Sequence, residues 1–193
     1  MKKTAFLIAF LVISATSAAA QSTEFGVIFG GSKRVTESDT PAKGTELLSE
    51  GFTFSNSSVD LYYAFELDPN TYFKVRVGRI EGPIGFREVE VRGVQEVSVR
   101  RDVEGEVQHV EGLVEYRFDE AFGSTGLYAG IGAYRHEAPG FSSATDYGFA
   151  VGVNGDFPIN RRYGVIVDAS YHYTKHDFSP RYLTIGAGLR IAF

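Results

Sequence analysis

The sequence predicts an all-β fold, an eight-stranded antiparallel up-and-down transmembrane β-barrel, and three observations support it. The chain ends in a stretch, 183–193, in which apolar residues alternate with small or polar ones. It begins with a segment typical of exported proteins, and the alternating pattern recurs several times in between. Alternation with a period of two lets one face of each strand meet lipid while the other faces a polar interior.

The first 20 residues have the pattern of a cleaved secretory signal. Lys2 and Lys3 precede an uncharged apolar run at 5–13, and three alanines before Gln21 fit a small-x-small cleavage site. A retained membrane anchor is the alternative, but the apolar run is short for a bilayer span. We therefore expect a single barrel domain over 21–193, whose formal charge changes from −5 to −7 when the two lysines are removed.

Composition narrows the class of protein. The chain contains no cysteine, so no disulfide framework holds it together. Its acidic balance argues against a nucleic-acid partner, for which a basic face is expected. Beyond the signal, no segment approaches the roughly 20 consecutive apolar residues of a transmembrane helix.

The first three strands are expected at about 23–31, 52–67 and 71–80. Their apolar faces consist of alternate residues: Phe25, Val27 and Phe29; Val59, Leu61, Tyr63 and Phe65; Phe73, Val75 and Val77. Asp68-Pro69-Asn70 separates the second strand from the third. It is a tight-turn signal, because proline presets one turn dihedral and asparagine tolerates the other.

The remaining five strands are expected at about 108–118, 127–134, 147–157, 165–174 and 183–193. Their apolar faces include Val110, Val114 and Tyr116; Leu127, Ala129 and Ile131; Phe149, Val151 and Val153; Val165, Val167 and Tyr171; Leu183, Ile185, Ala187, Leu189, Ile191 and Phe193. Glycines opposite these faces make room in a crowded lumen.

Connection lengths and aromatic positions support the same fold. The links after the second, fourth and sixth strands are short, whereas long outer loops are expected at about 33–50 and 81–107. Short turns on one side and longer loops on the other are typical of bacterial outer-membrane barrels. Tyrosine and phenylalanine gather near both ends of the strands, as expected at two membrane interfaces.

The faces opposite the apolar ones carry charge. An eight-stranded barrel is nearly filled by its side chains, so buried acids and bases are expected to pair. We predict a structural charge network inside the lumen, composed of Glu66, Lys74, Arg76, Glu111, Glu115, Arg117, Asp168 and Arg190. Asp60, Asp156 and His172 are expected on the same interior face. A gated conduit for small ions is the alternative role of these charges.

The segment 86–101 alternates valine with charged residues on both sides of Gly93. We expect it to extend the barrel wall as a hairpin of two amphipathic strands above the membrane. Arg87, Arg92, Arg100 and Arg101 are candidates for binding anionic lipid headgroups or phosphates through this loop. The hairpin edge could instead bind a partner by β-addition, or the segment could be a solvated loop without a ligand.

We expect no catalytic residue, no cofactor and no metal site. His172 with Thr174 superficially resembles the His-x-Ser of lipid A deacylase barrels, but threonine replaces the serine and no glutamate follows. The four histidines lack metal-site spacing and no cysteine joins them. A lipid A-modifying enzyme is kept as an alternative despite these departures. A periplasmic lipocalin-like binding protein is another alternative, although the tryptophan usual near the first lipocalin strand is missing.

The signal, the glycine-rich strands at 126–132 and 147–153, and the terminal segment 188–193 resemble the outer-membrane β-barrel family of OmpA-like and OmpX-like proteins. The resemblance spans the mature chain and implies a bacterial outer-membrane location among lipid and lipopolysaccharide. It implies insertion by the barrel-assembly machinery, with Leu189, Ile191 and Phe193 as the assembly signal. It also implies surface loops with a binding or adhesion role toward an extracellular partner, and no peptidoglycan-binding domain, since the chain stops at Phe193.

Overall fold

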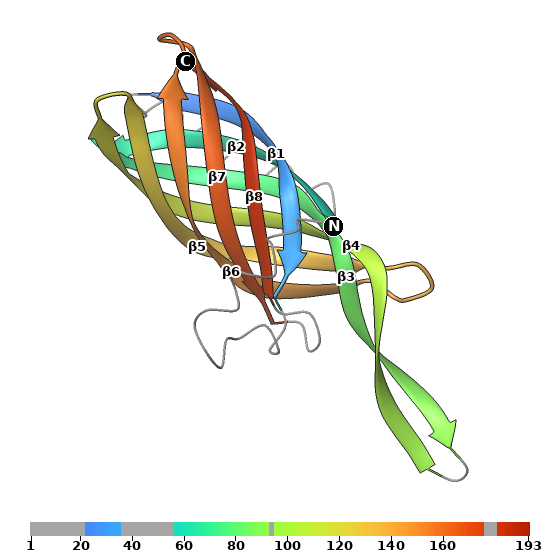
Figure 1. The fold of residues 1–193 in the computed structure, drawn as a ribbon. Helices are drawn as coiled ribbons and strands as arrows, with labels where there is room; N and C mark the ends of the chain where they lie inside the picture. The colour runs from blue at the N-terminus through green and yellow to red at the C-terminus, as the bar shows by residue number, and fades with distance from the viewer. Residues whose placement is uncertain (1–21, 36–55, 93–94, 176–180) are drawn as a thin grey trace, which may run out of the picture.

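The structure is a computed structural model that describes residues 22–35, 56–92, 95–175 and 181–193, with the backbone alone for 86–101. Eight strands follow one another along this part of the chain (Figure 1). They are β1 (Thr23–Arg34), β2 (Asn56–Asp68), β3 (Thr71–Arg92), β4 (Gln95–Glu120), β5 (Gly123–Glu137), β6 (Ala144–Pro158), β7 (Tyr163–Thr174) and β8 (Arg181–Ala192).

Each strand pairs antiparallel with its neighbours in sequence, and β8 returns to β1 to close the barrel. A row of cross-strand partners that leaves β6 at Tyr147 passes around all eight strands and returns to β6 at Phe157, ten residues further along. This stagger tilts the strands to about 35–45° from the barrel axis. The predicted fold class is confirmed.

Within the described residues the strands lie where the alternating pattern placed them, but several are longer than expected, β3 and β4 most of all. Residues 52–55 of the second expected strand lie outside the described residues. β3 and β4 continue through most of the segment 81–107, which was expected to be a long loop, and pair as far as Arg92 with Gln95. They form the expected hairpin, which projects beyond the barrel at the end opposite the C-terminus (Figure 1). We name this end of the barrel the outer end.

The backbone register of the hairpin pairs Glu88 with Val99 and Glu90 with Val97. The expected loop at 33–50 begins later than predicted, because Lys33 and Arg34 belong to β1. Residues 36–50, like the predicted signal 1–20, lie outside the described residues.

The barrel is apolar outside and polar inside. Outward side chains such as Phe29, Ile131 and Leu189 are 60%, 75% and 58% exposed, whereas inward Arg76 and Glu111 are each 1% exposed. A small apolar cluster fills the lumen toward the outer end: Ile80, Ile84, Val107, Tyr134 and Tyr182. Among the described residues no helix is long and apolar enough to cross a membrane.

Two glycines show how tightly the interior is filled. A Cβ at Gly26 would lie 2.6 Å from the hydroxyl of Tyr62, and one at Gly152 would lie 2.3 Å from that of Tyr128. Both positions lie on inward faces of their strands. Glycine therefore leaves the space that these two tyrosine rings occupy in the lumen.

Candidate functional site

The polar interior is organised around Arg76 of β3. Its Nε donates to Glu111 Oε2 at 2.7 Å, and its Nη1 donates to Ser170 Oγ at 2.8 Å. Nη1 also lies 3.5 Å from Asp168 Oδ1. One guanidinium from β3 thus connects a carboxylate on β4 with a polar pair on β7, across the width of the lumen.

A tyrosine completes this central group. The hydroxyl of Tyr128, on β5, donates to Asp168 Oδ2 at 2.8 Å and accepts a bond from Arg76 Nη1 at 3.1 Å. Ser170 Oγ contacts the same hydroxyl and donates to Asp168 Oδ1 at 2.6 Å. All four side chains are at most 4% exposed, so water does not weaken these contacts.

Two histidines lie on the outer side of Arg76. Nδ1 of His172 is 2.8 Å from Glu111 Oε1, and the Tyr134 hydroxyl donates to the same oxygen at 2.6 Å. His109 Nε2 is 2.9 Å from Asp60 Oδ1, and its ring centroid is 5.2 Å from that of His172. The two imidazoles therefore face the carboxylates of β2 and β4.

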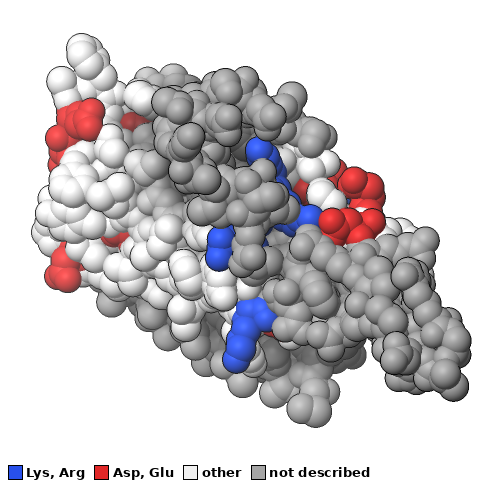
Figure 2. All heavy atoms as spheres, turned by 60° about the horizontal axis from the view of Figure 1, so that its bottom comes forward, with Lys and Arg blue, Asp and Glu red and all other residues white. Residues whose placement is uncertain are grey.

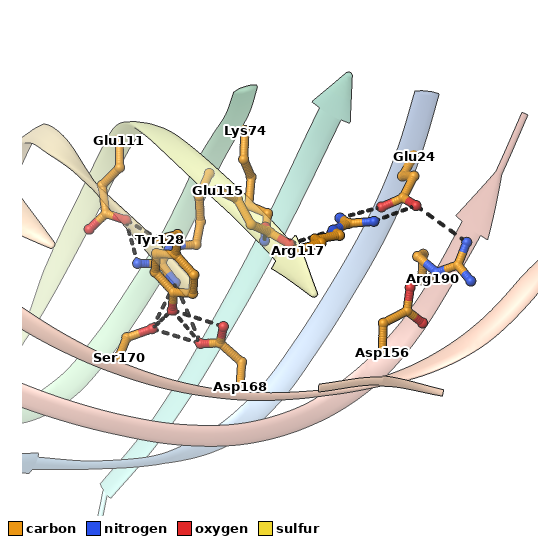
Figure 3. A network of polar contacts seen from close by, with 11 residues as sticks. Glu24, Lys74, Glu111, Glu115, Arg117, Tyr128, Asp156, Asp168, Ser170 and Arg190 are labelled. Carbon is orange, nitrogen blue, oxygen red and sulfur yellow. Dashed lines mark hydrogen bonds and ion pairs between the residues drawn. The ribbon is translucent and has the colours of Figure 1, made fainter. Parts of the chain in front are cut away.

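A second group occupies the inner half of the lumen. Arg117 donates to both oxygens of Glu24, at 2.9 and 2.7 Å, in a bidentate pair. It also contacts Glu115, which forms an ion pair with Lys74. Arg190 Nε lies 2.7 Å from Asp156 Oδ2. This second group joins β1, β3, β4, β6 and β8 (Figure 3).

Buried carboxylates outnumber buried lysine and arginine side chains in the interior. Within the described residues, four buried lysine and arginine side chains face six buried carboxylates. Two of those carboxylates, on Asp60 and Glu111, contact histidine. An isolated buried charge is costly, and pairing offsets that cost. The arrangement links strands on opposite sides of the lumen through ion pairs and hydrogen bonds.

The structure brings together seven of the eight residues of the predicted network: Lys74, Arg76, Glu111, Glu115, Arg117, Asp168 and Arg190. Glu66 lies apart from them, half-buried near the inner end, where Ser22 Oγ donates to it at 2.8 Å. Glu66 keeps the inward register of β2, opposite Tyr72, but it is the last regularly paired residue before the register shift between Glu66 and Asp68.

Sequence reasoning missed Glu24, which bridges Arg117 and Arg190. The signal was present, because Glu24 precedes the outward Phe25 and shares the parity of inward Ile28. Tyr128 and Ser170 were also missed as network members. Their inward parity was visible, but their contact with Arg76 depends on barrel closure.

The structure supplies an acid for His172 that the sequence did not indicate. Glu111 contacts one ring nitrogen, and Thr184 Oγ1 lies 3.4 Å from the other. A carboxylate, an imidazole and a hydroxyl in this order is the arrangement that activates a nucleophile. Here the three side chains are at most 3% exposed, so a substrate has no open approach to the hydroxyl. Ser170 is bonded to Asp168 and Arg76 instead of to His172.

The other predicted residues lie outside the network. Leu189, Ile191 and Phe193 are on the outward face at the end of β8, and Phe193 N donates to the carbonyl of Thr23 at 2.9 Å. Arg87 pairs with Arg100 in the backbone register of the hairpin, Arg101 with Phe86 and Arg92 with Gln95. No group of three or more histidine, aspartate or glutamate residues in the described part of the chain is arranged to hold a metal ion.

Comparison with known proteins shows a shared fold and no closer relationship. No protein-family model matches the sequence, and no curated protein matches it significantly. The chain is similar in structure to Neisserial surface protein A, with a TM-score of 0.55 and 12% identity over 89% of this chain and 96% of that one. It is also similar to the N-terminal β-barrel domain of Pseudomonas aeruginosa OprF, with a TM-score of 0.51 and 11% identity over 90% of this chain and 98% of that one. These neighbours are outer-membrane eight-stranded barrels, and the chain has their fold.

Proposed function

We propose that this chain is a non-enzymatic protein of the bacterial outer membrane, with a side-chain-filled lumen and a structural or surface-binding, adhesion-type role. The observation that supports this most strongly is that apolar side chains lie outside the barrel and charged ones inside, the reverse of a soluble protein. Phe29, Ile131 and Leu189 face outward and are more than half exposed, while Arg76 and Glu111 are buried. A soluble barrel with this surface would leave a continuous apolar belt in water, whereas lipid stabilises it.

The first test is folding of the mature chain with and without an amphiphile. We expect it to need detergent or lipid, and to migrate differently on a gel before and after boiling because closed strand pairing resists detergent. A folded, monodisperse protein in buffer alone would contradict the proposal and favour a lipocalin-like binding protein. Altered lipid A in expressing cells, lost on His172→Ala, would instead favour the enzyme alternative.

The surface role is supported by the β3–β4 hairpin. Within the described residues, β3 pairs with β2 only as far as Ile80, and β4 pairs with β5 only from Glu106. The hairpin beyond these residues has strand edges without a described partner strand, and such edges can bind an extended segment of another protein. We propose that the hairpin is exposed on the cell surface and available to an extracellular partner.

Because the chain contains no cysteine, single cysteines can report its orientation. Glu104 lies at the base of the hairpin and Asp119 at the inner end of β4, and both are exposed. We expect a membrane-impermeant maleimide to label Glu104→Cys on intact cells and to leave Asp119→Cys unlabelled until the cells are broken. The reverse pattern would place the hairpin in the periplasm and contradict the surface role.

A small-ion conduit is the second candidate, because charged side chains follow one another along the lumen from Asp156 to Asp60. We propose that the lumen is closed, since Arg76 of β3 contacts Tyr128 of β5 and Ser170 of β7 across it. Planar-bilayer recordings of the purified protein are therefore expected to show no discrete conductance. A discrete conductance that changes with Arg76→Met would replace the structural role by a gated one.

Assembly also belongs to the proposal. We propose that Leu189, Ile191 and Phe193 form the signal by which the barrel-assembly machinery inserts the chain. All three lie outward at the end of the closing strand, so they are accessible before the barrel closes. Deleting Phe193 is expected to reduce the amount of assembled barrel in cells while leaving folding of the purified chain into detergent nearly unchanged. Unchanged assembly in cells would contradict this role.

A further inference from the structure

The outward face of the barrel changes from apolar to polar at a sharp boundary near the outer end. On each strand, alternation identifies the first polar outward residue beyond the apolar belt: Lys33, Ser57, Arg79, Gln108, Arg135, Thr145, Lys175 and Arg181. Five of these are basic and none is acidic. At the inner end, the corresponding residues of β1, β3, β4 and β5 are Thr23, Thr71, Glu120 and Thr125. The inner turn between β6 and β7 contains exposed Arg161 and Arg162, so basic residues are more numerous at the outer end but are not confined to it.

The basic residues of β3 and β5 are neutralised by carboxylates. Arg79 lies 3.0 Å from Glu81 and 3.4 Å from Glu106. Arg135 lies 2.6 Å from Glu137. Figure 2, turned so that the outer end comes forward, shows acidic side chains grouped near the base of the hairpin. Arg79 and Arg135 therefore have little net charge to offer a ligand.

The other three basic residues form a different arc. Lys175, Arg181 and Lys33 lie at the outer ends of β7, β8 and β1, which are consecutive strands of the closed barrel. No carboxylate among residues 22–35, 56–85, 102–175 and 181–193 forms an ion pair with any of them. We call these three residues the basic arc.

Backbone pairing fixes the spacing of the basic arc. Arg181 lies opposite Tyr173 on β7, and its carbonyl accepts a bond from Val35 N at 3.1 Å on the β1 side. Lys33 is therefore diagonal to Arg181 across one strand pair, and Lys175, two residues beyond Tyr173, is diagonal to it across the other. Diagonal neighbours in a sheet are separated by about 7–8 Å. Long lysine and arginine side chains reach a common ligand over that distance.

The surface below the basic arc is apolar. Tyr173 stacks on Phe149 with ring centroids 5.1 Å apart, and Leu183 lies opposite Lys33. Exposed Phe29 and Ile185 continue this surface toward the middle of the barrel. A ligand that matches both parts has hydrocarbon chains along the wall and a negative group at their end.

We infer that the basic arc binds the phosphate of an anionic lipid in the leaflet at the outer end of the barrel. Arginine and lysine form charge-assisted hydrogen bonds to phosphate oxygens, and arginine does so in a bidentate manner. The inference rests on the proposed membrane location. It goes beyond that location by assigning the lipid contact to one side of the barrel, β7–β8–β1, and not to the β3–β5 side.

The chain contains no tryptophan, so one introduced tryptophan reports its local lipid. Tyr173→Trp places the reporter beside the basic arc, and Val77→Trp places the matched control two residues from Arg79. Each protein is inserted into vesicles of phosphatidylcholine with a fraction of phosphatidylglycerol, and either lipid carries dibrominated chains that quench the reporter. The ratio of quenching measures the local preference for the anionic lipid.

We expect the Tyr173→Trp reporter to show a several-fold preference for phosphatidylglycerol, because each basic side chain at an anionic surface contributes a factor of up to about five. The triple variant Lys33→Gln/Lys175→Gln/Arg181→Gln should reduce that preference to near unity. The Val77→Trp reporter should show little preference, and Arg79→Gln/Arg135→Gln should leave the Tyr173→Trp result unchanged.

Equal quenching by the two lipids at Tyr173→Trp, or a preference that survives the triple variant, would overturn the inference. Insertion is measured separately, by gel mobility before boiling. A chain that does not insert contradicts the proposed function, whereas an inserted barrel without lipid preference contradicts only this inference.

Discussion

Replacing Arg76 by methionine should destabilise the barrel more than any single substitution of an exposed charge. The guanidinium is 1% exposed and contacts Glu111, Asp168, Ser170 and Tyr128. Methionine keeps an apolar stem but leaves two buried carboxylates without their shared cation. Breaking a buried pair by removing one partner costs about 3–5 kcal/mol, so we expect the free energy of unfolding to fall by about that amount.

The matched control is Arg79→Met, three residues further along the same strand and on its outward face. Arg79 has a side chain that is 49% exposed, and it pairs with Glu81 and Glu106 near the surface. Exposed ion pairs contribute about 0–1 kcal/mol, so this variant should lose no more than that. The contrast separates burial of the charge from the chemistry of arginine itself.

The assay is urea unfolding in lipid vesicles, followed by circular dichroism and by the gel mobility of unboiled samples, with linear extrapolation to zero urea. The double variant Arg76→Met/Glu111→Gln should recover part of the loss, because it removes one of the two carboxylates left without a cation. If Arg76→Met costs less than about 1 kcal/mol, or no more than Arg79→Met, the lumen is solvated and the network does not stabilise the fold.

Three further predictions concern the wall, the lipid face and the hairpin. Gly152→Ala should lower the free energy of unfolding by about 1–3 kcal/mol, because its Cβ would overlap the Tyr128 hydroxyl. The control is Gly112→Ala, whose Cβ would lie 3.3 Å from Phe73 on the outer face. Equal losses of unfolding free energy in the two variants would contradict the tight packing of the lumen. Ile131→Arg should cost about 2–4 kcal/mol in vesicles, although the residue is 75% exposed, and a loss below about 0.5 kcal/mol would indicate that this face meets water. Replacing residues 86–101 by a short glycine-containing turn should leave the unfolding free energy within about 1 kcal/mol of the unaltered protein. The reason is that this part of the hairpin pairs only with itself in the described structure. A larger loss would show that it packs on the barrel.

The alternation of residues predicted which face of each strand lies outward. It did not predict which side chains meet inside the lumen, as four glutamates show. Glu111 and Glu115 lie inward on β4, with inward Leu113 between them, as their parity indicated. Glu66 keeps the inward parity, but it lies at the inner end of β2, where Ser22 Oγ donates to it. Glu24 obeys the pattern, but nothing near it in the sequence indicates that it meets Arg117. A local period of two specifies a face, and it carries no information about neighbours across the lumen.

The sequence by itself determined that this chain forms a closed wall of eight strands, apolar outside and charged inside, because side-chain direction alternates along every strand whatever the strand pairs with. Only the tertiary structure decided which charges meet. The ten-residue stagger on closure brings Arg76 to Asp168, Arg117 to Glu24 and Arg181 between Lys33 and Lys175. Those contacts join residues far apart in the chain, and their positions depend on strand register, which all eight strands fix together.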